Sequence, residues 1–159
     1  MVIFTGCLNL KSDEQIVTEK LMELVSALQD KNHDDIKSLF APNIISSLDN
    51  FDDSINDLTA YYDGVYESFD EGGLITEQDR DSGIDRKWFN MSHDVTTNVD
   101  IFRIAIIWYV IDTGDTKNIG IWSLYIIKFD DDTTPEYSYR GDGWWTNGIH
   151  IGKPYARRE

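Results

Sequence analysis

Histidine is the side chain best suited to proton transfer near neutral pH, and the sequence contains His33, His93 and His150. None of them has a second histidine or a cysteine at the spacing of a metal-ligand pair, so we expect no zinc site. His93 is followed directly by Asp94, and such a pair could act as acid and base. Neighbouring side chains on a strand point to opposite faces, however, so the two would not act together. A structural role is the favoured interpretation of each histidine.

Two acidic runs could in principle bind calcium. They are Asp112-Thr113-Gly114-Asp115 and Asp130-Asp131-Asp132. Neither has the spacing of ligands found in an EF-hand loop, which requires a central glycine and a closing acid. We interpret both runs as solvated turns and expect neither a metal ion nor a cofactor.

The only cysteine, Cys7, follows the apolar segment Val2 to Gly6 and precedes a polar stretch. This pattern resembles the end of a bacterial lipoprotein signal peptide, in which the cysteine after a small residue is lipidated. We therefore expect residues 1–11 to be the end of a signal and a tether. The protein would be anchored at the bacterial cell surface through lipid on Cys7 alone. If Met1 is the native start, the alternative is a cytoplasmic protein.

Composition indicates one folded domain over residues 12–159. The chain has 159 residues, of which 41% are hydrophobic and 13% aromatic, enough for a core without disulfides. Its 29 acidic and 14 basic residues give a net charge of −15. Such a charge repels nucleic-acid phosphates, so we expect no nucleic-acid partner.

The first helix is expected to begin with a capping box formed by Ser12 and Gln15 and to end near Lys31. Apolar residues then recur at helical spacing and predict one buried face. These positions are Ile16, Val17, Leu21, Leu24, Val25 and Leu28.

Two further helices are expected before residue 65. Asn32 can cap a second, shorter helix, which Pro42 interrupts because proline cannot donate to the helical ladder. The third begins around Asp52 and closes at Gly64, with apolar residues at spacings of three and four.

The remainder of the chain has the composition of β-structure. Residues 71–86, with the turn signal Glu71-Gly72-Gly73, indicate a loop, and residues 112–118 a polar hairpin connection. In 101–111, the alternation that includes Phe102 and Trp108 should face the helices. We expect strands at 65–69, 87–97, 101–111 and 119–129, and a last one at 137–139 or 148–151.

The segment from Ile119 to Phe129 is apolar on both alternations, which predicts cover on both faces of the sheet. One face would expose Ile121, Tyr125, Ile127 and Phe129, a patch large enough to mark a homodimer interface. The competing explanation is that residues 133–152, with Trp144 and Trp145, fold back over that face and leave a monomer.

The order of these segments resembles a known family. Three N-terminal helices, the leader ending in Gly6-Cys7, the central hairpin with Asn118 to Ile121, and the closing Gly148 to Ile151 are similar to the bacterial lipoproteins of domain of unknown function 5104, within the nuclear-transport-factor-2-like superfamily. The resemblance implies an α+β fold in which three helices pack on a curved antiparallel sheet of four to six strands and enclose a cone-shaped cavity.

Members of that superfamily include enzymes and binding domains, so fold alone does not decide the function. The interpretation favoured by the resemblance is a non-catalytic domain that binds a small apolar or amphipathic ligand. Its candidate pocket-lining residues are Tyr62, His93, Trp108 and Trp122. One alternative is an acidic protein-binding module of the immunity type, motivated by the net charge of −15. The other is an isomerase or dehydratase in which His93 or a buried aspartate serves as base.

Overall fold

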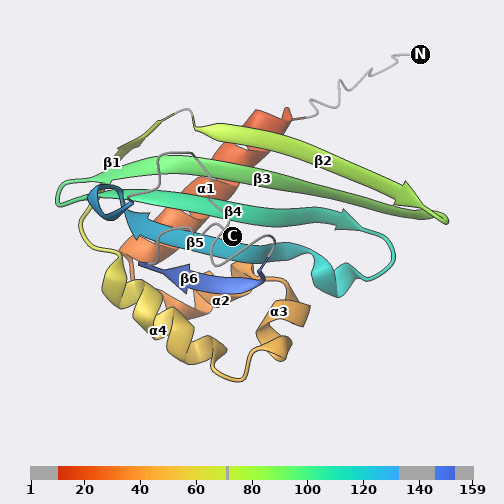
Figure 1. Ribbon diagram of the computed structural model, residues 1–159, viewed down its shortest axis with the longest axis horizontal. Coiled ribbons are helices and arrows are strands. Elements are labelled where there is room, and N and C mark those ends of the chain that lie inside the picture. Colours follow the sequence, from red (N-terminus) through yellow and green to blue (C-terminus); the bar gives the residue numbers. More distant parts are fainter. Residues whose placement is uncertain (1–10, 71, 133–145, 153–159) are drawn as a thin grey trace, which may run out of the picture.

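The computed structural model describes residues 11–70, 72–132 and 146–152, and it shows an α+β fold with helices first and a curved, unclosed sheet after them (Figure 1). The helices of the described residues are α1 (Asp13–Gln29), α2 (His33–Leu39), α3 (Pro42–Ser47) and α4 (Phe51–Tyr61), with short 3₁₀ turns η1 (Thr116–Asn118) and η2 (Phe129–Asp131). The strands are β1 (Tyr66–Phe69), β2 (Gly73–Asp81), β3 (Ile84–Thr97), β4 (Ile101–Asp112), β5 (Gly120–Lys128) and β6 (Gly148–Ile151). Cys7 and residues 137–139 lie outside the described residues.

Helix α1 begins and ends as the sequence predicts. The Ser12 side chain accepts from the Gln15 backbone N–H, and the Gln15 side chain accepts from the Ser12 backbone N–H. At the other end Lys31 adopts a positive φ of 50°, which lets the Asn32 N–H reach the Ala27 carbonyl at 3.0 Å. Both ends of α1 are therefore capped by local interactions.

Between residues 11 and 64 the structure has four helices where the sequence predicts three. Pro42 occupies the first turn of α3, where its missing N–H costs nothing, so it starts a helix and does not merely interrupt one. Asn32 caps α2 as expected, its side chain accepting from the Asp35 N–H. None of the helices in the described ranges is long and apolar enough to cross a membrane.

The sheet has six strands in the order β1-β3-β4-β5-β6, and β2 also pairs with β3. Because β1 pairs with residues 95–97 of β3 and β2 with residues 84–92, these two strands share one edge of the sheet. All pairs are antiparallel except β5 with β6, which is parallel. The expectation of a purely antiparallel sheet is wrong at this edge, where β6 returns after the connection that follows η2.

The segment predicted to be a loop, residues 71–86, contains all of strand β2 and the start of β3, so that prediction is wrong. Strand β2 lies at an edge and is exposed on both faces, which removes the alternation that identifies a half-buried strand. Its turn to β3 uses Ser82 and Gly83, which both have positive φ (51° and 84°), as tight hairpins require.

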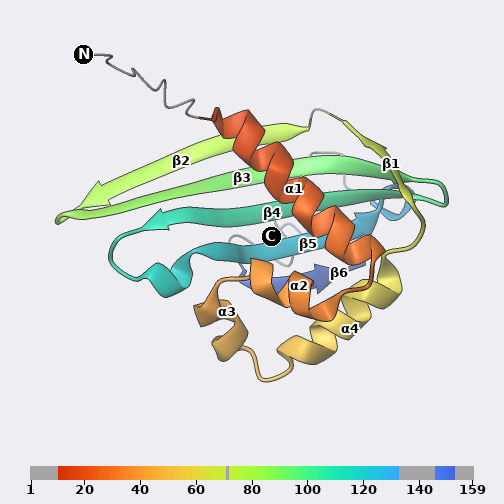
Figure 2. The ribbon, with the colours of Figure 1, turned by 180° about the vertical axis from the view of Figure 1, so that it is seen from behind.

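The helices cover one face of the sheet, with α1 crossing it diagonally and α2 to α4 lying over the β5–β6 edge (Figure 2). The α1 N-terminus is held to β3 by the ion pair between Asp13 and Lys87 at 2.6 Å. Its C-terminus is held at β1, where the Gln29 side chain accepts from the Tyr66 N–H at 2.9 Å. The expected alternation faces the helices: Phe102, Ile104, Ile106 and Trp108 all belong to the main core.

A β-bulge in β5 changes the faces predicted for that strand. Ser123 pairs with Ile107 and Ile121 pairs with Trp108, so Trp122 is the extra residue and Ile121 turns toward the helices. Ile121, Tyr125 and Ile127 are all buried in the single chain, and of the predicted patch only Phe129 is exposed, at 41%. The prediction of an exposed apolar patch on this strand is therefore wrong, whereas the homodimer itself stays a prediction.

Candidate functional site

An aromatic cluster lies between helices and sheet at the β1 end of the molecule. It consists of Tyr62, Tyr66, Phe69, His93 and Phe102. The Tyr62 and Phe102 rings lie 4.9 Å apart, and the Phe69 ring meets the His93 ring edge-on at 5.5 Å. The cluster is built across three strands, because Val95 of β3 pairs with Phe69 on one side and Phe102 on the other.

His93 lies on the buried alternation of β3, between Met91 and Val95, and is only 6% exposed. Its Nδ1 is 3.1 Å from the Asp70 carbonyl oxygen. A carbonyl oxygen can only accept, so Nδ1 carries the hydrogen in this contact. In the neutral imidazole Nε2 is then an acceptor, and no hydrogen-bond partner reaches it among the described residues.

Backbone geometry keeps the chain close to His93. Gly72, in the connection from β1 to β2, has a positive φ of 54°. A Cβ at this position would overlap the Ser92 carbonyl oxygen and the His93 ring, so only glycine fits here. The turn signal at Gly72 was visible in the sequence, but its contact with His93 depends on the pairing of β1 with β3.

Asp94 points to the opposite face of β3, as the strand alternation predicts. Its carboxylate accepts two hydrogen bonds from Arg103, at 2.8 and 3.0 Å. The third nitrogen of Arg103 donates to Asp132 at 2.7 Å. Asp94 therefore serves an ion-pair network and not the imidazole of His93.

Tyr62 caps the C-terminus of α4 and contributes a second polar atom without a partner. The residue is 1% exposed, and its hydroxyl forms no hydrogen bond with the described residues. Burial, and to a lesser extent the nearby Tyr66 phenol, raises the pKa of Tyr62 to about 12. The hydroxyl thus stays protonated at neutral pH and is available as a donor.

The two tryptophans predicted to line a pocket lie elsewhere in the fold. Trp108 is buried beneath α1, with the Lys20 ammonium 5.1 Å from the centre of its ring. It is six residues from Phe102, which is about 20 Å along β4. Trp122 is the half-buried extra residue of the β5 bulge. The aromatic cluster accordingly contains Tyr62 and His93 but neither tryptophan.

A comparison with protein-family models identifies the family of this chain. The model described as Domain of unknown function (DUF5104) matches residues 23–129. The chain belongs to the DUF5104 family. No curated protein matches it. The matched range contains Tyr62, His93, Trp108 and Trp122, together with most of the helix layer and strands β1 to β5.

Two of the hollows on the surface of this DUF5104 chain are lined by described residues. The larger, about 610 Å³, is an open groove between α1 and α2. It is lined by Glu19, Met22, Glu23, Ser26, Ala27, Asp30, Asp35, Ser38 and Leu39. The smaller, about 290 Å³, lies at the β3–β4 turn and is lined by residues 97–101 together with Phe129 and Asp130. Neither hollow contains any of the four candidate residues of the sequence prediction.

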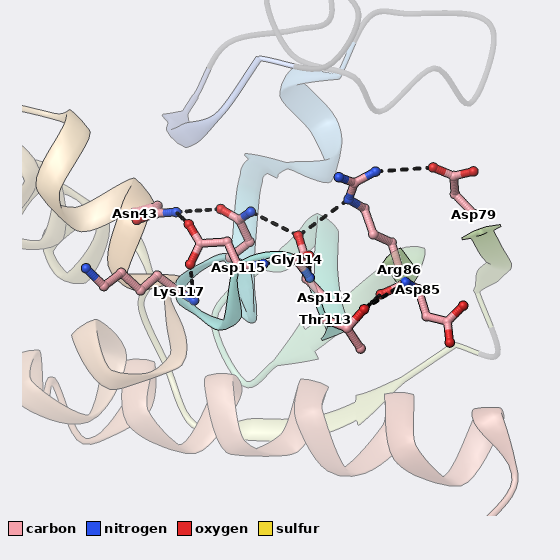
Figure 3. A network of polar contacts seen from close by, with 10 residues as sticks. Asn43, Asp79, Asp85, Arg86, Asp112, Thr113, Gly114, Asp115 and Lys117 are labelled. Carbon is pink, nitrogen blue, oxygen red and sulfur yellow. Dashed lines mark hydrogen bonds and ion pairs between the residues drawn. The ribbon is translucent and has the colours of Figure 1, made fainter. Parts of the chain in front are cut away.

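The acidic run at residues 112–115 organises the β4–β5 connection of the DUF5104 domain (Figure 3). The Asp112 carboxylate is buried and accepts from the backbone N–H groups of Gly114 and Asp115, at 2.9 and 3.0 Å. It also accepts from the Asn118 side chain at 3.0 Å. Asn43 of α3 donates to both Asn118 and Asp115 and thereby ties the turn to the helix layer.

Asp112 therefore has a structural role that sequence spacing did not reveal. Burial, the largest effect, raises its pKa, but the hydrogen bonds from Asn118, Asp115 and Gly114 and the charge of Arg86 outweigh burial and leave the pKa lowered. In residues 11–70, 72–132 and 146–152, no three acidic, histidine or cysteine side chains are grouped as a metal site would require.

Proposed function

We propose that this DUF5104 domain binds a small apolar or amphipathic molecule between its helices and its sheet, at the aromatic cluster. The observation that carries the proposal is the pair of unpartnered buried atoms, His93 Nε2 and the Tyr62 hydroxyl. Leaving a buried polar group without a hydrogen bond costs about 1–3 kcal/mol. A ligand whose hydrogen-bonding group reaches either of these atoms, and whose apolar body contacts Phe69 and Phe102, would recover part of that free energy.

The fold supports the finer assignment to the nuclear-transport-factor-2-like superfamily, which we also propose. Helices on one face of a curved, unclosed sheet are the arrangement implied by the resemblance (Figures 1 and 2). The proposed site lies between these two layers, where the resemblance places a cavity.

Nuclear magnetic resonance of the full chain with ¹⁵N-labelled histidine tests the binding proposal. We expect phenol to shift the Nε2 resonance of His93, because its hydroxyl can donate to that nitrogen, while toluene binds at least tenfold more weakly. His33 and His150 are internal controls and should not move. The proposal fails if phenol at saturating concentration leaves His93 unchanged, or if toluene and phenol bind equally well.

The same geometry distinguishes binding from catalysis. An isomerase or dehydratase would use His93 Nε2 as a base and the Tyr62 hydroxyl as a donor to a carbonyl. Cyclohexanone in D₂O then provides a direct test, because a base at this position exchanges its α-protons. We expect binding without exchange above that of the His93→Phe variant. Exchange that depends on His93 would assign the enzyme alternative.

We further propose that the domain is held at the outer face of a bacterial membrane by lipid on Cys7. The proposal rests on the sequence around that cysteine, which resembles a lipidation site. Mass spectrometry of the protein from its native cell tests it directly. We expect an N-terminal diacylglyceryl-cysteine at Cys7, and an unmodified Cys7 in a soluble fraction would overturn the assignment.

A further inference from the structure

The groove between α1 and α2 is lined mostly by exposed residues and shares none of its lining with the aromatic cluster. Its floor has an apolar element, since Met22 and Leu39 are only partly buried and Ala27 lies between the helices. The groove follows α1 from Glu19 to Asp30, a length of about 17 Å at the rise of an α-helix. It therefore matches about three turns of a second helix.

All four charged residues that line the groove are carboxylates: Glu19, Glu23, Asp30 and Asp35. Lys11 pairs with Glu19 and Lys20 with Glu23, but these pairs are exposed and such pairs contribute little. A basic side chain entering the groove meets negative charge along its whole length. The occupant that fits this groove is therefore positively charged.

Asp30 strengthens the preference of the groove for a positively charged group. It is the C-cap residue of α1, where the helix dipole is negative, and the last turn of α1 contains no basic residue. Its carboxylate has no ion pair or side-chain hydrogen bond with the residues that the structure describes. A carboxylate at this end of a helix is unfavourable by itself and gains most from an incoming positive charge.

We propose that this groove binds a basic amphipathic helix of a partner protein. One or two apolar side chains of that helix lie on Met22 and Leu39, and its lysine or arginine side chains face Glu23, Asp30 and Asp35. Methionine adapts its shape to such contacts. This inference goes beyond the proposed ligand site and gives the acidic protein-binding alternative a definite location.

The test uses the full chain and a synthetic amphipathic helix of lysine and leucine, with a scrambled peptide of the same composition. We expect the amphipathic peptide to bind at least tenfold more tightly than the scrambled one. The groove variant Glu23→Gln/Asp30→Asn/Asp35→Asn should weaken binding about tenfold, since three charge contacts are lost. Met22→Ser should weaken it several-fold through the apolar contact.

The matched control is Asp49→Asn/Asp57→Asn/Glu67→Gln, which changes the net charge equally at exposed positions outside the groove. We expect this control to weaken binding less than threefold. If both triple variants lose affinity for the peptide equally, the peptide responds only to the net charge of −15, and the proposal is overturned. Sedimentation without peptide is the second arm: dimerisation lost only in the groove variant would assign the groove to a second copy of the chain instead.

Discussion

The hydroxyl of Tyr61 accepts a hydrogen bond from the backbone N–H of Lys128 at 3.0 Å, which joins the end of α4 to the end of β5. The next residue, Tyr62, has a buried hydroxyl with no partner among the described residues. Two adjacent tyrosines thus differ in whether their hydroxyl groups are satisfied.

Replacing each of these tyrosines by phenylalanine should change stability in opposite directions. Tyr61→Phe leaves the Lys128 N–H without its acceptor, so we expect the free energy of unfolding to fall by about 1 kcal/mol. Tyr62→Phe removes an unsatisfied hydroxyl, so we expect it to rise by about 1 kcal/mol in the ligand-free protein. Urea unfolding of both variants measures this, and a destabilised Tyr62→Phe would mean that the hydroxyl has a partner after all.

The raised pKa of Tyr62 predicts a loss of stability in alkali. In the unfolded chain a tyrosine titrates near its ordinary value of 10.0, whereas in the folded chain Tyr62 titrates at about 12. The protonated Tyr62 hydroxyl therefore makes its full contribution to the free energy of unfolding below pH 10. This contribution is lost as the pH rises toward 12, because the unfolded chain releases the proton first. At pH 11 the loss is about 1 kcal/mol. We measure the free energy of unfolding of wild type and Tyr62→Phe from pH 8 to 11. The stability of the variant relative to wild type should increase over this range. A constant difference between the two would contradict the raised pKa of Tyr62.

The buried guanidinium of Arg103 holds two carboxylates, those of Asp94 and Asp132. Arg103→Ala removes the buried cation from this network, so we expect a loss of about 3–5 kcal/mol. Lys128→Ala is the control, because it removes the same charge from a more exposed pair with Asp100 and should cost less than about 1 kcal/mol. Thermal or urea unfolding distinguishes the two, and losses of equal size would show that burial of the network adds nothing.

Local signals in the sequence were sufficient for the elements with strong patterns. The capping box at Ser12 and the helical spacing from Val17 to Leu28 predict α1, and both are confirmed. The alternation that includes Trp108 predicts the face of β4 that packs against the helices, and this is also confirmed. Each of these features depends on residues a few positions apart, so one segment contains the whole signal.

Features that depend on pairing between distant segments could not be predicted. Strand β2 has polar residues on both faces because it lies at an edge, so no alternation reveals it. The bulge at Trp122 is defined only by the register of β5 against β4, and it reverses the face of Ile121. The parallel pairing of β6 with β5 is likewise not specified by residues within either strand.

The candidate site was predicted in part. His93 follows the buried alternation of its strand, so the sequence could place it, but the Asp70 carbonyl that fixes its tautomer is brought there by β1. The groove requires α1 and α2 to lie side by side, which no spacing within either helix specifies. The sequence therefore points to single residues and not to the neighbours that surround them in the fold.

The β4–β5 connection provides the last test, because the buried Asp112 carboxylate accepts from Asn118, whose own side-chain oxygen accepts from Asn43 at 2.7 Å. In Asp112→Asn an amide N–H₂ would face that of Asn118, and rotating Asn118 would break its bond to Asn43. We therefore expect a loss of about 2 kcal/mol at pH 7.

The lowered pKa of Asp112 gives that loss a pH dependence whose sign follows from linkage. The ionised carboxylate contributes stability above the ordinary value of 3.8, and the contribution disappears as the pH falls through the lower folded-state pKa. The gap between wild type and Asp112→Asn should accordingly shrink below pH 4 in urea unfolding. Asp49→Asn is the control, since Asp49 is exposed and lies outside this network, so the variant should differ little from wild type at either pH. A gap for Asp112→Asn that is unchanged between pH 7 and pH 3 would show that the ionised carboxylate does not hold this turn together.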